Sequence, residues 1–350
     1  MFRFAAIVAM TLSTVALAEI RIQGGGATFP NPLYQRWVVE YQKAQRDVKI
    51  DYQSIGSGGG IKGLTDKTFD FAGSDAPMSK KERDAAKDAV VHIPTVAGAV
   101  VLAYNLPDLK HEVKLSGPVV AEIYMGKIAK WNDAKIAALN EGVKLPDLAI
   151  TPVYRTDGSG TTFVFTNYLA TQSEAFIEKI GPGKQVKWPV GQGGKGNEGV
   201  TAVVKSTPGA IGYIEVNYAV ENKMPYALMQ NRDGKFIKAS PQTVAAAGEG
   251  ALKQMTKSLA VDLWNQPGEE AYPIAAFTYV IVYQDLANLK DEAKAKAFVD
   301  FLWWATHEGQ QMAAAMQYAP LSKGVQEKVS QAIGTLTFNG KVLRPVEAAK

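Results

Sequence analysis

The chain of 350 residues contains no cysteine and only three histidines. The absence of cysteine excludes disulfides, thiolate metal sites, a cysteine nucleophile and a lipid-modified N-terminal cysteine. The histidines, His92, His111 and His307, lie far apart in the sequence and lack the close spacing of a zinc-binding motif. We therefore expect no metal site, and no motif indicates a cofactor.

Positive and negative charges are nearly balanced, with 38 Lys and Arg residues against 34 Asp and Glu residues. A net charge of +4 dispersed over a chain of this length is too weak to indicate nucleic-acid binding. Beyond residue 18, no apolar run has the length of a membrane-spanning helix.

The first 18 residues have the three parts of a secretory signal peptide. Arg3 supplies an early positive charge, an apolar stretch follows from Ala5, and Ala16-Leu17-Ala18 forms a small-residue cleavage signal before Glu19. The apolar stretch is too short for a membrane span. We therefore expect export to the periplasm, with cleavage after Ala18.

The rest of the chain is long for a single core, so two lobes are expected. Apolar runs rich in β-formers, such as 48–52 and 99–104, alternate with amphipathic helical patterns, such as 33–41 and 293–304. This alternation favours an α/β architecture.

The segment Arg155-Thr156-Asp157-Gly158-Ser159-Gly160-Thr161-Thr162 places a cation, hydroxyls and glycines directly before an apolar run with helical spacing. A helix N-terminus has unpaired N–H groups and a partial positive charge, and glycine allows a ligand to approach them closely. Arg155 adds planar donors suited to phosphate or carboxylate. The segment fits either an anion pocket or an ordinary helix cap.

Three more segments have the same character, namely 24–30, 55–61 and 69–77. Thr28 and Ser57 each lie with glycines between an expected strand and an expected helix, and Asp75 follows a short strand. In open α/β sheets, ligands bind at the carboxyl ends of the strands. The four segments are therefore predicted to meet in one cleft that is rich in neutral donors.

Four motifs are similar to the ligand-binding segments of a known family: Gly26-Ala27-Thr28-Phe29-Pro30, Ile55-Gly56-Ser57, Gly73-Ser74-Asp75-Ala76-Pro77 and Arg155-Thr156-Asp157-Gly158-Ser159-Gly160-Thr161. The family is the periplasmic phosphate-binding proteins of the PstS type. Further similar stretches lie at 128–133, 186–191 and 208–213. The resemblance covers most of the chain in order and becomes looser after about Pro273.

This resemblance implies a bilobal periplasmic solute-binding fold of type II, with the ligand between two lobes that close about a two-segment hinge. The first lobe would comprise 19–95 and 275–350, the second 96–274, with crossings near 93–95 and Pro273. It also implies a monomeric binding protein and not an enzyme. Its partners would be inorganic phosphate and the permease subunits of an ABC transporter in the inner membrane.

The resemblance assigns a role to each of nine residues. Hydroxyl or amide donors to phosphate would come from Thr28, Phe29, Ser57, Ser159, Gly160 and Thr161. Arg155 would be the one cationic contact, held in place by Asp157, and Asp75 would accept the proton of the phosphate.

A carboxylate in an anion site makes sense if the ligand carries a proton. Phosphate has an O–H at neutral pH, whereas sulfate has none. A site built around a ligand O–H can reject an analogue without it by about 10⁴-fold or more. Asp75 is therefore predicted to select phosphate against sulfate.

Two other functions are considered from the residues. An exported phosphatase or hydrolase would use Ser159 as its nucleophile, but the surrounding sequence does not fit G-x-S-x-G. A nucleotide-binding enzyme would use 191–196, which formally fits G-x-G-x-x-G but follows a segment containing Pro189. We expect 191–196 to be a surface loop. A binding protein for another protonated tetrahedral oxyanion also stays open.

Overall fold

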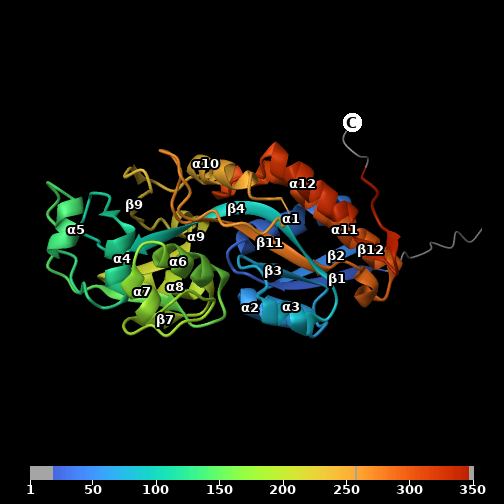
Figure 1. Cartoon of the computed structure of the whole chain (residues 1–350), viewed down its shortest axis with the longest axis horizontal. Coiled ribbons are helices and arrows are strands. Elements are labelled where there is room, and N and C mark those ends of the chain that lie inside the picture. Colours follow the sequence, from blue (N-terminus) through green and yellow to red (C-terminus); the bar gives the residue numbers. More distant parts are fainter. Residues whose placement is uncertain (1–18, 257, 347–350) are drawn as a thin grey trace, which may run out of the picture.

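The computed structural model describes residues 19–256 and 258–346, and these form two lobes that lie side by side (Figure 1). The predicted signal peptide, residues 1–18, lies outside the described residues. Helices and strands alternate along most of the chain, which confirms the predicted α/β class. Within the described ranges, no helix is both long and apolar enough to cross a membrane.

One sheet of eight strands runs through both lobes. In spatial order the strands are β2 (Val48–Ser54), β1 (Ile20–Gly26), β3 (Phe71–Ser74), β11 (Ala275–Tyr283), β4 (Val90–Tyr104), β8 (Ala210–Glu215), β6 (Thr151–Arg155) and β7 (Gln192–Gly194). The three strands at each end are mutually parallel, whereas the central pair is antiparallel. The minor strands are β5 (Lys114–Leu115), β9 (Leu228–Gln230), β10 (Phe236–Ile237), β12 (Thr337–Phe338) and β13 (Lys341–Val342).

Strands β4 and β11 connect the two lobes (Figure 1). Residues 90–99 of β4 pair with β11, and residues 100–104 pair with β8. β11 is buried throughout and β4 from Ile93 onward, as is typical of apolar strands covered on both faces. The lobe boundaries at 95/96 and 274/275 stay predictions. The change of partner in β4 lies between Ala99 and Val100.

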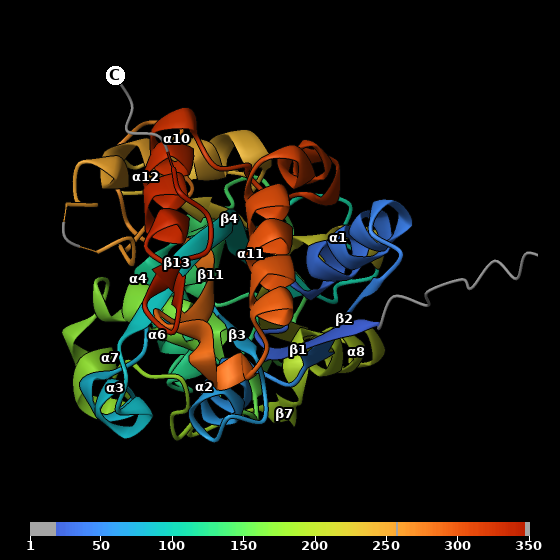
Figure 2. The same cartoon turned by 90° about the vertical axis from the view of Figure 1, so that its right-hand side faces the viewer.

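Helices cover the sheet in both lobes. The first lobe carries α1 (Asn31–Ala44), α2 (Ser57–Thr65), α3 (Lys80–Ala86), α11 (Glu292–Thr306) and α12 (Lys323–Gly334). The second carries α4 (Gly117–Tyr124), α5 (Ala134–Leu139), α6 (Gly160–Ala170), α7 (Glu174–Lys179), α8 (Gly196–Ser206) and α9 (Val216–Glu221). Helix α10 (Pro241–Leu252) packs on the central strands. Short 3₁₀ turns are Leu286–Leu289, Glu308–Met312 and Ala314–Met316. Figure 2 shows α12 and α1 on either side of α11.

The helix predicted over 33–41 from its amphipathic pattern is confirmed, since these residues lie in α1. Its first turn contains a proline, whose fixed φ suits a helix start. Tyr34 and Trp37 are buried and stack with ring centroids 5.4 Å apart. The helix therefore forms because one face covers the sheet.

The glycines at 58–60 are not a turn before a helix, as predicted, but lie inside α2. A Cβ atom on Gly60 would lie 2.4 Å from the carbonyl oxygen of Gly25 and 2.5 Å from Cα of Gly26. Gly60 therefore allows α2 to pack directly on β1, which continues through these glycines. Gly58 instead approaches the second lobe, where its N–H donates to the Gly158 carbonyl at 2.8 Å.

Replacing Gly60 with Ala should lower the free energy of unfolding by about 2 kcal/mol, because the added methyl group would push α2 away from backbone atoms. Urea unfolding of the two proteins measures the difference. Gly248→Ala in α10 is the matched control, since its Cβ atom would have no neighbour within 4 Å. That control should be stabilised by up to about 1 kcal/mol. Equal stability of the two variants would contradict the packing argument.

Candidate functional site

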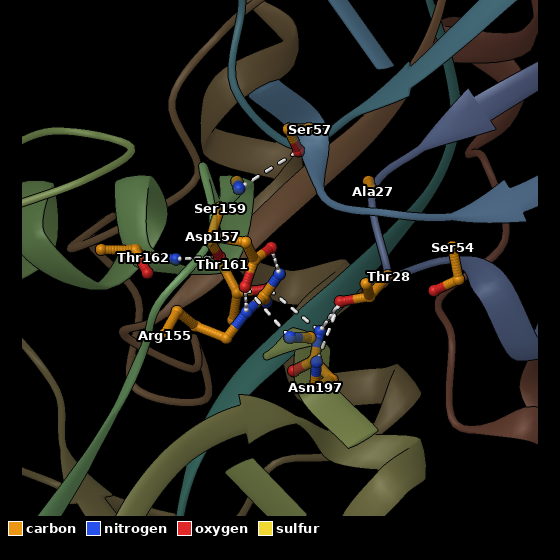
Figure 3. A network of polar contacts seen from close by, with 12 residues as sticks. Ala27, Thr28, Ser54, Ser57, Arg155, Asp157, Ser159, Thr161, Thr162 and Asn197 are labelled. Carbon is orange, nitrogen blue, oxygen red and sulfur yellow. Dashed lines mark hydrogen bonds and ion pairs between the residues drawn. The ribbon is translucent and has the colours of Figure 1, made fainter. Parts of the chain in front are cut away.

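Four helices begin at one place between the lobes. Thr28 and Phe29 precede α1, Ser57 begins α2, Gly160 begins α6, and Gly196 begins α8. Each helix follows a strand of the main sheet, and the helix starts lie near one another in Figure 3. The parallel strands in each lobe bring their carboxyl ends to one edge, where α/β proteins bind ligands. The partial positive charges of four helix N-termini thus gather in one place.

Several backbone N–H groups in this region lack an acceptor. In the part of the chain that the structure describes, no hydrogen bond is made by the amides of Thr28, Phe29, Ser57 and Thr161. All four residues are buried. Buried backbone donors without a partner are rare and costly. They therefore indicate an acceptor-rich ligand.

The carbonyl groups of Thr28 and Phe29 point away from the site and accept hydrogen bonds from tyrosine hydroxyls. Tyr218 Oη donates to the Thr28 carbonyl at 2.6 Å, and Tyr318 Oη donates to the Phe29 carbonyl at 2.7 Å. Tyr218 belongs to α9 and Tyr318 follows η3 (Ala314–Met316), so both lobes hold this turn. The turn thus directs its donors, and not its acceptors, into the site.

The hydroxyl of Ser57 is held as a donor. Its Oγ accepts from the N–H of Gly160 at 3.1 Å and from the N–H of Asp75 at 3.3 Å. A serine oxygen has two lone pairs and one proton, so both acceptor positions are used. Within 19–256 and 258–346 no group accepts its proton. The Gly160 amide, predicted to contact the ligand, here donates to Ser57.

The hydroxyls of Thr28 and Thr161 are held in the same way. Thr28 Oγ1 accepts from the backbone N–H of Asn197 at 3.1 Å and from its Nδ2 at 2.6 Å. Thr161 Oγ1 accepts from Asn197 Nδ2 and from Arg155 Nη1, both at 3.2 Å (Figure 3). Both hydroxyls keep a proton to donate.

Ser159 caps α6, and its neighbours explain the local geometry. Its Oγ accepts from the Thr162 N–H at 2.9 Å, and its own N–H donates to the Lys184 carbonyl at 2.8 Å. The segment therefore contains the predicted helix cap. Because the same helix start contributes to the cluster of donors, the cap and the anion pocket are not alternatives.

Arg155 is a buried cation at the end of β6, with only 1% of its side chain exposed. Its Nε donates to Asp157 Oδ1 at 2.8 Å and its Nη2 to Asp157 Oδ2 at 2.5 Å. Burial opposes the charge of Asp157, but the ion pair with Arg155 holds the pKa of that carboxyl below its usual value. Asp157 also accepts from the Gly196 N–H at 3.0 Å, which fixes the ion pair against α8.

Asp75 supplies the acceptor of the site. Its Oδ1 accepts from Thr278 Oγ1 at 2.7 Å, whereas its buried Oδ2 has no partner among the described residues. A Cβ atom on Gly160 would lie 2.4 Å from that Oδ2, so the free oxygen faces the start of α6. Burial raises the pKa of the Asp75 carboxyl to about 7, against the Thr278 hydrogen bond and the Arg155 charge.

The structure gathers all nine residues predicted from the sequence into this region, but it adds Asn197. The loop predicted for 191–196 is wrong, since 192–194 form β7 and Gly196 begins α8, although most of these residues do lie at the surface. Asn197, in the first turn of α8, is fully buried. The signal was present in the sequence, because 191–199 repeats the glycine-rich strand-to-helix pattern with an amide in place of a hydroxyl.

Further contacts join the lobes around the site. Lys184 Nζ donates to Glu82 Oε2 of α3 at 2.6 Å, and Ser54 Oγ donates to Glu198 Oε1 at 3.1 Å. The two lobes are therefore in direct contact around the site. In the described residues, no group of three or more His, Asp or Glu residues is placed to hold a metal ion.

Comparisons with known proteins agree with this geometry. A profile of the PBP superfamily domain matches residues 13–304. The phosphate-binding protein PstS of Pasteurella multocida is 42% identical over 332 residues, covering 94% of this chain and 95% of the relative. The PstS protein of Methanocaldococcus jannaschii is 40% identical over 333 residues, covering 90% and 85%.

The fold is also that of solved phosphate-binding proteins. A high-affinity periplasmic phosphate-binding protein with phosphate bound, PfluDING, superposes with a TM-score of 0.72 over 93% of this chain and 100% of that one, at 20% identity. This likeness confirms the bilobal solute-binding fold. The relatives are named as binding proteins and not as enzymes. The chain therefore belongs to the PBP superfamily and, within it, to the PstS family of phosphate-binding proteins.

Proposed function

We propose that the protein binds inorganic phosphate between its lobes and delivers it to an ABC importer. One observation carries the proposal: among the described residues, the buried site combines several free donors with the unpartnered carboxylate oxygen Asp75 Oδ2. Four amides and three hydroxyl protons can reach the oxygens of an anion, and the carboxylate can receive one proton. A phosphate that offers one proton to the carboxylate matches this set of donors and acceptor.

Selectivity against sulfate follows from the same inventory. Sulfate offers no proton, so above the Asp75 pKa of about 7 it would place an oxygen against the ionised carboxylate with nothing between them. Because Asp75 is buried, water cannot relieve the repulsion. Arsenate also carries a proton and stays an alternative ligand on this argument.

A hydrolase that uses Ser159 has less support. Within the described residues, the hydrogen bonds of Ser159 Oγ include the cap to Thr162 but no histidine. His92 Nε2 accepts from the Met78 N–H at 3.0 Å, and His307 contacts Ser330. A nucleophile without a neighbouring base is not activated.

The cellular role follows from the family. Relatives carry the name PstS, and the solved neighbour PfluDING is periplasmic. We propose that residues 1–18 direct export, that the mature chain is a periplasmic monomer, and that the closed lobes present phosphate to permease subunits in the inner membrane.

Equilibrium dialysis of the phosphate-stripped protein with labelled phosphate tests the proposal. We expect saturable binding of one phosphate per chain that unlabelled phosphate displaces and sulfate does not. Displacement by arsenate would identify the broader ligand class. Absence of phosphate binding would contradict the proposal, and turnover of a phosphate ester that is lost in Ser159→Ala would support the hydrolase.

The pKa of Asp75 makes a separate prediction about pH. Because burial raises this pKa to about 7, the carboxyl is protonated below that pH and can donate to sulfate, whereas above it the carboxylate repels sulfate. Sulfate itself stays fully ionised across this range. Sulfate affinity should therefore fall about tenfold per pH unit between pH 7 and 9 and level off below pH 7.

Sulfate titrations from pH 5.5 to 9 measure this profile. The control is Asp75→Asn, whose sulfate affinity should not follow the same slope, because the titrating carboxyl is gone. This control also separates Asp75 from Glu215, a buried acid whose pKa burial raises well above its usual value. A flat profile in the wild-type protein would contradict the assignment.

A further inference from the structure

Asn197 contacts proposed ligand-binding residues of both lobes at once. Its side-chain Nδ2 donates to Thr28 Oγ1 at 2.6 Å in the first lobe and to Thr161 Oγ1 at 3.2 Å in the second. Its Oδ1 accepts from the backbone N–H of Glu215 at 2.9 Å. Figure 3 shows Asn197 below Thr28 and Thr161, with dashed lines to both.

These contacts fix the orientation of the amide group. The N–H of Glu215 requires an acceptor, so it holds Oδ1 on that side and directs Nδ2 toward the threonines. An amide nitrogen carries two hydrogens, and each has one threonine oxygen as its acceptor. The side chain is fully buried, so water cannot replace any of these bonds.

These contacts determine which hydrogen bonds the two threonine hydroxyls can still make. Asn197 fills both lone pairs of Thr28 Oγ1, through its backbone N–H and its Nδ2. At Thr161 Oγ1 it fills one lone pair and Arg155 fills the other. Neither hydroxyl can then accept a proton from a ligand, although both can donate.

We propose that Asn197 is a positioning residue that sets the hydroxyls of Thr28 and Thr161 as donors to the bound anion. The inference rests on the proposed phosphate function and adds a specificity role to it. With these hydroxyls and that of Ser57 unable to accept, the ligand proton is directed to the unpartnered Oδ2 of Asp75. Asn197 also makes the two lobes share one donor set, so that binding a ligand and closing the lobes are linked.

The variant Asn197→Asp tests this role because it keeps the shape of the side chain and the acceptor for Glu215. The introduced carboxylate would draw the threonine protons toward itself, so the hydroxyls would no longer serve the ligand. Phosphate affinity measured by calorimetry at pH 8 should fall about 100-fold or more, as expected for the loss of two hydrogen bonds to a charged ligand. It should recover toward pH 5 as the carboxyl is protonated.

A second background separates positioning from simple charge repulsion. In Thr28→Val, one of the two hydroxyls is already absent, so Asn197→Asp should cost about tenfold less than it does with Thr28 present. Repulsion alone would give the same cost in both backgrounds. Equal costs, or unchanged phosphate affinity in Asn197→Asp, would overturn the inference.

Two controls keep the result interpretable. Asn140→Asp is matched, because Asn140 is buried and its side chain bonds to backbone groups of Lys114 and Ile136 among the described residues. It should lower the melting temperature without changing phosphate affinity. If Asn197→Asp does not fold, Asn197→Ala is measured in the same two backgrounds and should again cost less with Thr28→Val. Failure of the wild-type protein to bind phosphate would instead contradict the proposed function itself.

Discussion

The variant Asp75→Asn should bind sulfate nearly as well as phosphate. At pH 8 the unpartnered Oδ2 of Asp75 in the wild-type protein is ionised and can only accept, whereas an asparagine amide can also donate. The preference for phosphate over sulfate, expected to be about 10⁴-fold or more, should fall to about tenfold or less. Competition titrations with the two anions at pH 8 measure this ratio.

A matched aspartate guards against a general effect on folding. Asp70 in the first lobe accepts from the Gln23 N–H and pairs with Lys294, away from the proposed site. Asp70→Asn should reduce stability and leave the anion preference unchanged. If Asp75→Asn keeps the wild-type preference for phosphate over sulfate, Asp75 does not accept the ligand proton and is not the source of the selectivity.

Removing the cation should have the largest effect on affinity. Arg155→Ala takes away a positive charge that is buried in the site and leaves Asp157, which is only slightly exposed, without its cationic partner. Both changes disfavour an anion, and truncation of one member of a buried charge pair typically costs 2–5 kcal/mol in binding. Phosphate affinity measured by calorimetry should therefore fall by about 10²- to 10³-fold.

The double variant Arg155→Ala with Asp157→Asn distinguishes the two contributions. It removes the orphaned carboxylate, so it should bind phosphate about tenfold more tightly than Arg155→Ala alone. Arg36→Ala is the surface control, because Arg36 forms an exposed ion pair with Glu40 within α1. Retention of near-wild-type affinity in Arg155→Ala would show that neutral donors suffice without the cation.

The sequence predicted the local elements of the site well because each has a local signal. Hydroxyls and glycines between a strand and a helix mark Thr28, Ser57 and Ser159, and the structure places all three at helix starts. The apolar run at 99–104 likewise marks a strand. Its length was not predictable, because β4 continues from one lobe to the other and changes its partner between Ala99 and Val100.

Contacts between segments that are distant in the chain could not be predicted from the sequence. Asn197 meets Thr28 from 169 positions away, and nothing near Asn197 in the sequence indicates that partner. The preceding glycines resembled a surface loop because Pro189 weakened the strand pattern. The sequence also could not show which groups donate to the hydroxyl oxygens. The Gly160 N–H and Ser57 Oγ, for example, belong to different lobes and meet only in the folded protein.

In this proposal the site recognises a protonated tetrahedral anion through several donors and the Asp75 carboxylate. Calorimetry of the phosphate-stripped protein at pH 8, titrated with phosphate and then in a separate experiment with sulfate, tests it most directly. We predict one phosphate site per chain, with sulfate affinity weaker by about 10⁴-fold or more. Equal affinity for the two anions, or no binding of phosphate, would contradict the proposed recognition of phosphate by Asp75.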